Sequence, residues 1–219
     1  MADTPPPSIS RRLALAMGLA ALPAHSVAAR GKVVTILGDS ITAGLGLPGR
    51  DALPNQLHLA LERLGVPNIV RGAGASGETT ADGAGRMDFS IRPDTAVVVI
   101  ALGGNDLLQG FDPKITRANL DRIITRLKAR HMGVVLAGMR APPELGRGYA
   151  RDFDAVFAGV AKTHNVAFYP DLLAGVGRNR ALNQADGIHP TPAGVDVIVA
   201  RMLPKAEELI ARVKAAGGS

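Results

Sequence analysis

The stretch Val33-Val-Thr-Ile-Leu-Gly-Asp-Ser40 decides the fold of this chain. Its apolar and β-branched residues run almost without interruption up to Gly38, which is typical of a strand buried on both faces of a parallel sheet. Open α/β sheets place their chemistry at the carboxyl ends of such strands. Ser40 therefore lies where this kind of fold would hold a nucleophile. Asp39 and Ser40 are also common helix caps, so this stretch alone leaves both interpretations open.

Four more segments are predicted to be strands, and helical segments alternate with them. The clearest strand, Thr95 to Leu102, runs directly into Gly103-Gly104-Asn105-Asp106. The alternation predicts an α/β fold with a mostly parallel sheet. We expect a three-layer sandwich with five strands in the flavodoxin-like order. The expected strands are 33–37, 68–71, 95–102, 133–139 and 166–169, and the expected helices are 53–64, 80–89, 113–130, 149–164 and 191–215, the last with a kink near Pro204.

A glycine-rich segment, Gly72-Ala-Gly-Ala-Ser-Gly77, follows the second expected strand. It has the Gly-x-Gly-x-x-Gly spacing of dinucleotide-binding loops, but that motif belongs after the first strand of a βαβ unit. The acidic residue expected about 20 positions later would be Asp94, which precedes a strand instead of ending one. We interpret the segment as a loop whose bare backbone N–H groups face a substrate.

Composition narrows the function classes. The 219 residues suit one domain with a substantial core. Aromatic residues make up only 3%, without Trp, so stacking platforms for single-stranded nucleic acid are not expected. The net charge of +6 comes from scattered Lys and Arg, which we interpret as solvated surface rather than a nucleic-acid footprint. The absence of Cys excludes disulfides, thiolate metal sites and a cysteine nucleophile.

The first 29 residues have the layout of a secretory signal. Arg11-Arg12 precede the apolar segment Leu13 to Leu22, and small residues follow at Val27-Ala-Ala29. The arginine pair is typical of the twin-arginine route, while the general secretory route stays open. The apolar segment is shorter than the ~20 residues that a membrane span needs. We therefore expect a periplasmic or secreted protein in which residues 30–219 form a single domain. An uncleaved anchor or a leader without structure is the alternative.

Asp186-Gly-Ile-His189 is the second candidate for chemistry. His189 is the one histidine expected in a loop close to a carboxylate. In a turn, this spacing lets Asp186 accept a hydrogen bond from Nδ1 of His189, which leaves Nε2 free as a base for a nucleophile. The alternative is a helix cap at Thr191 beside a solvated imidazole. Ser40, Gly77, Asn105, Asp186 and His189 all follow expected strands or precede the last helix, so we expect them to converge on one edge of the sheet.

Four sequence blocks resemble, in order and spacing, the conserved blocks of the SGNH (GDSL) hydrolases. The resemblance covers nearly the whole chain from Lys32 to the last helix and is strongest for the periplasmic thioesterase I/arylesterase/lysophospholipase subgroup. One departure is Leu53-Pro54, where relatives often carry Trp-Pro. The blocks are Gly38-Asp39-Ser40, Gly77, Gly103-Gly104-Asn105-Asp106 and Asp186-x-x-His189.

The resemblance implies a role for each matched residue. Ser40 would be the nucleophile, His189 the general base and then acid, and Asp186 the residue that orients His189. The oxyanion hole would be the N–H of Ser40, the N–H of Gly77 and the side-chain amide of Asn105. No Gly-x-Ser-x-Gly elbow surrounds Ser40, which disfavours the common α/β-hydrolase fold. No cofactor or metal is expected.

The expected function is a serine esterase or thioesterase acting on small acyl esters or thioesters, with neither a nucleic-acid partner nor a stable membrane span. A carbohydrate or peptidoglycan O-acetyl esterase on the same scaffold is the first alternative. A non-catalytic binding protein of this fold is the second. No motif specifies the preferred length of the acyl chain of the substrate or the oligomeric state of the protein.

Overall fold

Five parallel strands form the centre of the molecule. The structure is a computed structural model that describes Met1 and residues 31–216, so the expected signal at residues 1–29 lies outside the described residues apart from Met1. The strand order is β2-β1-β3-β4-β5, which confirms the predicted flavodoxin-like sheet. The strands are β1 (Lys32–Gly38), β2 (Asn68–Gly74), β3 (Thr95–Ala101), β4 (Gly133–Ala137) and β5 (Ala167–Tyr169).

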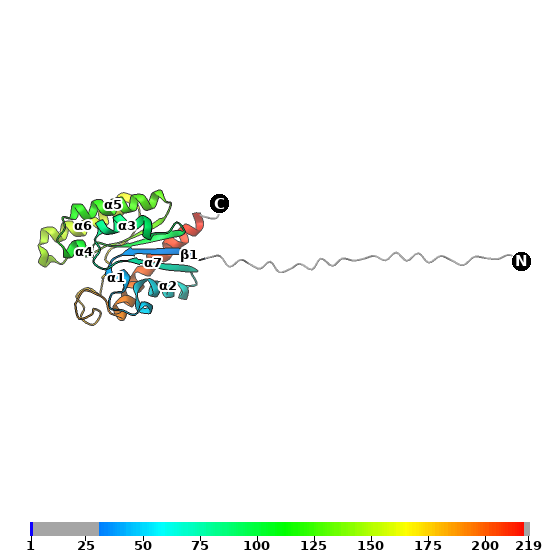
Figure 1. Cartoon of the computed structure of the whole chain (residues 1–219), viewed down its shortest axis with the longest axis horizontal. Coiled ribbons are helices and arrows are strands. Elements are labelled where there is room, and N and C mark those ends of the chain that lie inside the picture. The colour runs from blue at the N-terminus through cyan, green and yellow to red at the C-terminus, as the bar shows by residue number, and fades with distance from the viewer. Residues whose placement is uncertain (2–30, 217–219) are drawn as a thin grey trace.

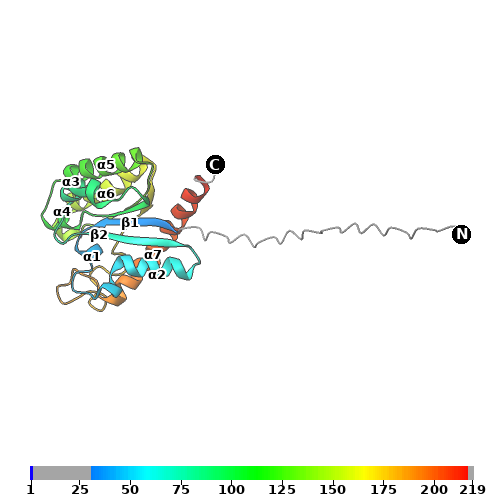
Figure 2. The same ribbon diagram turned by 45° about the vertical axis from the view of Figure 1, so that its right-hand side comes forward.

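Helices cover both faces of the sheet and complete the predicted three layers. Helices α3, α5 and α6 lie on one face, and α1, α2 and α7 lie on the other (Figure 1, Figure 2). The helices are α1 (Ser40–Ala43), α2 (Leu53–Arg63), α3 (Thr80–Ser90), α4 (Gly104–Leu108), α5 (Pro113–Ala129), α6 (Arg147–His164) and α7 (Pro192–Ala216), with short 3₁₀ helices η1 (Gly49–Asp51) and η2 (Pro143–Leu145). Among the described residues, no helix has both the length and the apolar character needed to cross a membrane.

The two central strands, β1 and β3, are buried because their side chains are almost all apolar. Residues 33–38 of β1 are buried, and residues 97–101 of β3 have no exposed surface. The one polar side chain inside β1, Thr35, shares a hydrogen bond of 2.9 Å with the hydroxyl of Thr95. A partner for this buried hydroxyl removes the cost of leaving it unsatisfied.

The strand register aligns the carboxyl ends of the central strands. Gly38 of β1 pairs with Gly74 of β2 on one side and with Ala101 of β3 on the other. The chain leaves β1 toward β2 and later returns to place β3 on the opposite side, which makes this edge the topological switch point of the sheet. Helices α1 and α4, which follow β1 and β3, lie at the same end of the sheet (Figure 1).

The prediction of a loop at 72–77 was wrong for its first half, because β2 continues to Gly74. A Cβ atom on Gly74 would lie 2.4 Å from the backbone nitrogen of Ala43 in α1. A Cβ atom on Gly72 would lie 2.8 Å from Cγ of Pro54 in α2. These glycines let two helices approach the strand closely, which explains their spacing without a nucleotide.

The helix predictions need smaller corrections. Asp112 caps α5 and Pro113 is its first residue. The apolar spacing of this helix predicts Ile115 on its buried face, but Ile115 is half exposed and Thr116 is buried instead. The short helices α1 and α4 were not predicted, since each is a single turn directly after a strand. Helix α7 continues through Pro204.

Candidate active site

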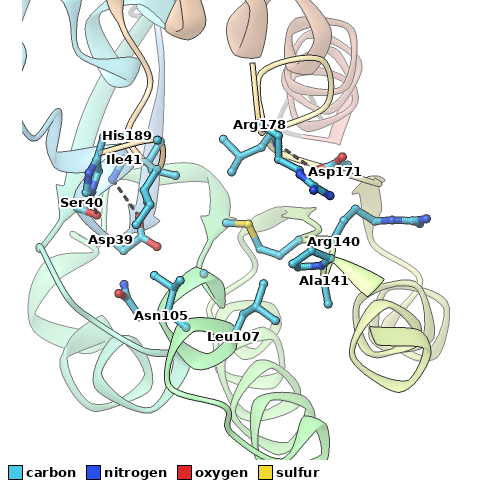
Figure 3. A pocket seen from close by; sticks show the side chains of 18 of the residues that line it. Asp39, Ser40, Ile41, Asn105, Leu107, Arg140, Ala141, Asp171, Arg178 and His189 are labelled. Atoms are coloured by element: carbon cyan, nitrogen blue, oxygen red, sulfur yellow. Dashed lines mark hydrogen bonds between the residues drawn. The ribbon is translucent and has the colours of Figure 1, made fainter. Parts of the chain in front are cut away.

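Ser40 is the first residue of α1, directly after β1. Asp39 is the N-cap of this helix, and its Oδ1 accepts a hydrogen bond of 3.0 Å from the backbone N–H of Ile41. The capping interpretation therefore holds for Asp39, while Ser40 lines a pocket (Figure 3). One short stretch thus serves both as a helix start and as the place where a hydroxyl is presented.

The structure brings Ser40, His189 and Asp186 together in one hydrogen-bonded chain. Nε2 of His189 lies 2.9 Å from Oγ of Ser40, across 149 positions of sequence. Nδ1 of the same ring lies 2.6 Å from Oδ2 of Asp186. His189 belongs to the loop between β5 and α7, so the nucleophile candidate and the base candidate come from opposite ends of the sequence.

Asp186 is held ionised by the loop that it organises. Its Oδ1 accepts hydrogen bonds from the backbone N–H groups of Ile188 at 2.9 Å and His189 at 3.0 Å. The hydrogen bond from the His189 ring, followed by these two backbone bonds, lowers the pKa of Asp186 to about 2. The carboxylate therefore remains an acceptor near neutral pH, and it can orient the ring so that Nε2 faces Ser40.

Gly77 lines the same pocket from the turn between β2 and α3, and Asn105 lines it from α4. Gly77 has a left-handed backbone with φ of 82°, and no atom beyond its two chain neighbours lies within 4 Å of the place where a Cβ would stand. Asn105, in the first turn of α4, donates one Nδ2 hydrogen to the carbonyl of Glu78 at 2.9 Å, which leaves its second hydrogen available. The backbone N–H groups of Ser40 and Gly77 donate to no other described residue.

The pocket has a cavity volume of about 580 Å³ and two different ends. Ser40, Asp39, Asn105 and His189 form one end, and the charged side chains of Asp171, Arg140 and Arg178 stand at the other (Figure 3). Most of the wall between them is apolar, formed by Ile41, Leu45, Leu107, Leu108, Met139, Ala141, Pro142, Leu173 and Ile188.

Three residues outside the five predicted site residues also bear on the site: Leu53, Asp106 and Arg86. Leu53, at the one departure from the family pattern, is fully buried and does not line this pocket. The sequence analysis assigned no role to Asp106 or Arg86. Both contact the segment that follows Gly77: Asp106 bonds Thr80, and Arg86 bonds Glu78. Asp106 directly follows Asn105 in its motif, whereas nothing in the sequence around Arg86 points to the site.

No group of three or more His, Cys, Asp or Glu side chains with metal-binding proximity occurs in the part of the chain that the structure describes. The described histidines on helices have other partners. Nδ1 of His58 lies 2.9 Å from Oδ1 of Asn68, and Nε2 of His164 lies 2.9 Å from Oδ1 of Asp121.

The chain is similar to several characterised hydrolases. It is 34% identical to esterase TesA of Pseudomonas aeruginosa over 200 residues, which is 91% of this chain and all of that one. It is 34% identical to an arylesterase of Vibrio mimicus over 72% of this chain and 79% of that one. It is 32% identical to thioesterase 1/protease 1/lysophospholipase L1 of Escherichia coli K12 over 74% of this chain and 77% of that one.

Solved structures and a family model agree with these similarities. The crystal structure of TesA matches with a TM-score of 0.77 at 34% identity, over 81% of this chain and 99% of that one. AlinE4, an SGNH-hydrolase family esterase, matches with a TM-score of 0.69 at 36% identity, over 81% of this chain and 96% of that one. Residues 36–197 match the model of the GDSL-like lipase/acylhydrolase family. With this match over most of its length and with relatives above 30% identity, the chain belongs to the GDSL-like lipase/acylhydrolase family.

Proposed function

We propose that this protein is a serine hydrolase that cleaves carboxylic esters or thioesters through an acyl-enzyme on Ser40. The observation that carries the proposal is the hydrogen-bonded chain from Ser40 through His189 to Asp186 at one end of an apolar pocket. A nucleophile, a base within hydrogen-bond reach and a group that orients the base are the parts that acyl transfer requires. The names of the relatives, which include an esterase, an arylesterase and a thioesterase, support the same reaction class.

The geometry supports a two-step reaction. In the first step Ser40 Oγ attacks the acyl carbon while its proton moves to Nε2 of His189, and Asp186 stabilises the imidazolium that forms. His189 then gives this proton to the departing alcohol or thiol, and the acyl group remains on Ser40. In the second step His189 takes a proton from water, the water oxygen attacks the acyl carbon, and the proton returns to Ser40 as the carboxylic acid leaves.

Three donors are available for the negative charge that develops on the carbonyl oxygen. We assign this role to the N–H of Ser40, the N–H of Gly77 and the free Nδ2 hydrogen of Asn105. Each comes from a different element, and the glycine presents its N–H without a side chain in the way. Donors fixed in advance around a developing oxyanion are often the largest single contribution to catalysis.

The apolar wall of the pocket favours an acyl chain over a sugar. Aliphatic side chains and methionine cover most of the space beyond Ser40. A carbohydrate would bring hydroxyl groups that need hydrogen-bond partners, which the apolar wall between Ser40 and the charged far end does not offer, and burying them there without partners is costly. The O-acetyl esterase alternative therefore receives less support from this pocket than an acyl esterase or thioesterase.

We also propose that residues 1–29 are an export signal and that residues 30–219 act as a single domain in the periplasm or outside the cell. The charged, apolar and small-residue regions of this segment support the proposal.

An acyl-length series tests the proposed reaction. The mature protein should hydrolyse p-nitrophenyl esters and acyl-CoA thioesters, and a fluorophosphonate probe should label it. The Ser40→Ala variant should lose the label and at least ~10³-fold in kcat while its thermal melt stays close to wild type. Near-normal turnover by this variant would move the nucleophile elsewhere, with Ser76 in the same pocket as the next candidate.

A further inference from the structure

Arg86, on the inner side of α3, makes hydrogen bonds through all three nitrogen atoms of its guanidinium. Nη2 donates to the backbone carbonyl of Gly38 at 3.0 Å and to that of Ala73 at 2.9 Å. Nε donates to a carboxylate oxygen of Glu78, and Nη1 donates to the hydroxyl of Ser90 at 3.0 Å. One guanidinium therefore ties together the end of β1, the end of β2 and the segment that follows β2.

The groups that Arg86 holds are the neighbours of the candidate oxyanion donors. Gly38 immediately precedes Asp39 and Ser40 in the sequence. Glu78 follows Gly77, and its backbone carbonyl is the acceptor that fixes the amide of Asn105 at 2.9 Å. The N–H of Ser40 is two residues from Gly38, and the N–H of Gly77 is one residue from Glu78. The amide of Asn105 is one hydrogen bond from Glu78.

This arrangement differs from an ordinary surface ion pair. The side chains of Arg86 and Glu78 are only 22% and 19% exposed. Arg71 and Asp94 also form a paired contact between β2 and the start of β3, but they are 29% and 56% exposed and no contact links them to the pocket. Exposed ion pairs of that kind contribute little to stability. Partly buried charge-assisted hydrogen bonds to backbone groups are stronger, and they fix the positions of those groups.

We propose that Arg86 is a positioning residue for the oxyanion hole. It holds Gly77 and Glu78 against the end of β1, so that the N–H of Gly77 and the amide of Asn105 point to the same place as the N–H of Ser40. This inference rests on the proposed hydrolase function, because it assigns a role within that reaction. Arg86 itself lies outside the pocket lining and touches no reacting atom.

A second anchor holds the other end of the same segment. The carboxylate of Asp106 is fully buried, accepts a hydrogen bond of 2.8 Å from the N–H of Thr80 and is bonded by the hydroxyl of Thr80. It also accepts a hydrogen bond of 3.0 Å from the hydroxyl of Thr116 in α5. With Thr80 fixed by Asp106, the contact between Arg86 and Glu78 holds the segment between Gly77 and Thr79 at its other end, together with the hydrogen bond from Asn105 to the carbonyl of Glu78.

The contacts at this position suit arginine better than lysine. A planar guanidinium presents several N–H donors in fixed directions, whereas lysine offers a point charge on a flexible stem. Arg86→Lys should therefore retain the charge next to Glu78 but lose part of the geometry. Arg86→Gln should lose both.

Steady-state kinetics on a p-nitrophenyl ester test the proposal, with each variant normalised to its folded fraction. We expect Arg86→Gln to lower kcat ~10–10²-fold with KM changed less than about threefold, because the donors act on charge that exists only near the transition state. Arg86→Lys should fall between this variant and wild type. The matched control Arg71→Gln should remain within about twofold of wild type, because it removes only an exposed pair.

Glu78→Ala gives a second route that does not depend on the stability of the arginine variants. It should lower kcat in the same direction, and the double variant Arg86→Gln/Glu78→Ala should lose less than the product of the two single losses, because both changes break one link. A folded Arg86→Gln enzyme with wild-type kcat would overturn the inference, as would wild-type kcat in Glu78→Ala. An inactive wild-type protein would instead remove the proposed function.

Discussion

The single side-chain amide of Asn105 makes two different connections. One Nδ2 hydrogen is bound to the carbonyl of Glu78, which fixes the plane of the amide, and the other hydrogen is available to a ligand in the pocket. Asn is also a common turn residue, but here Gly103 makes the turn with φ of 115°, and Asn105 already lies within α4. The backbone therefore does not require an asparagine at this position.

Substitutions at Asn105 distinguish two alternative roles of this residue, a hydrogen-bond donor to the oxyanion and a turn residue. Asn105→Ala removes one fixed donor and should lower kcat ~10²–10³-fold with a smaller change in KM. Asn105→Asp is nearly isosteric but places a carboxylate opposite both the developing oxyanion and the carbonyl of Glu78, so it should be no more active than the alanine variant at neutral pH. Steady-state kinetics with thermal melts measure both effects. A well-folded Asn105→Asp enzyme with nearly full kcat would exclude Asn105 from the oxyanion hole.

Asp39 is a buried carboxyl next to Ser40, the proposed nucleophile. Burial raises the pKa of its carboxyl from 3.8 to about 6, although the hydrogen bond from the N–H of Ile41 and the nearby His189 act in the opposite direction. A carboxyl whose pKa is raised by folding binds its proton more tightly in the folded state. The contribution of this carboxyl to the free energy of unfolding therefore falls as pH rises from about 4 to about 6 and stays level above that range.

The variant Asp39→Asn tests this pH dependence. Asparagine keeps the oxygen that caps α1 but has no charge, so the variant should gain stability relative to wild type between about pH 4 and pH 7, by up to about 3 kcal/mol. Urea titrations across this range measure the difference. Asp186 does not interfere, because its pKa of about 2 confines its contribution to lower pH. Parallel stability curves for the two proteins would show that Asp39 does not titrate as described.

At the scale of elements, close contact between β2 and the two helices packed on it, α1 and α2, decides where Ser40 lies. Gly74 allows α1 to contact the strand through backbone atoms, without an intervening side chain. Helix α1 has Ser40 as its first residue, so the position of the hydroxyl depends on this contact. A glycine in a strand usually weakens it, and here that weakness is offset by the fixed position of the helix.

We expect Gly74→Ala to destabilise the protein by at least about 1–3 kcal/mol, because the added methyl group would meet backbone atoms that cannot rotate away. The shift of α1 should also lower kcat. Gly85→Ala is the matched control, since it lies in the interior of α3 with no atom within 4 Å of the added Cβ. That variant should instead gain about 0.5–1 kcal/mol from helix propensity. Thermal and urea unfolding of both variants measure these changes. A Gly74→Ala variant with the stability of the wild type would refute the close-packing argument.

Most elements were predictable from sequence because periodicity and capping residues are local signals. The continuous apolar runs of β1 and β3 and the Asp112-Pro113 start of α5 needed no tertiary information. The extension of β2 through Gly72 and Gly74 was missed because glycine usually ends a strand, and only the neighbouring helices explain its presence. Which of Ile115 and Thr116 is buried depends on how α5 is rotated against its neighbours, and that rotation is not specified by the local sequence.

At the scale of the whole molecule, the convergence of Ser40, Gly77, Asn105, Asp186 and His189 was predictable from the rule that parallel strands end at one edge. The contacts that hold these residues and the pocket around them were not predictable. The hydrogen bonds of Arg86 reach 48 positions back to Gly38, and such a distance leaves no local pattern. The apolar pocket is likewise assembled from helices and loops that are far apart in the sequence, so its shape follows only from the folded chain.

The export proposal concerns the chain as a whole. If residues 1–29 are a signal, the native mature protein should begin at or near Arg30 and be found in the periplasm or the medium. N-terminal sequencing of the protein from cell fractions measures this directly. Replacing Arg11-Arg12 by Lys-Lys should block export if the twin-arginine route is used, and unchanged export would indicate the general route. A cytosolic protein that retains Ala2 would refute the proposal.

The 149 positions between Ser40 and His189 also bear on how activity arises during folding. A contact between such distant positions carries a large loop-closure entropy and forms after the local contacts that bring its ends together. A chain that has been synthesised only through β5 already contains the proposed nucleophile and the three proposed oxyanion donors, yet it lacks the proposed base. Recovery of turnover during refolding therefore reports completion of the entire topology, whereas circular dichroism reports the earlier appearance of helices and sheet.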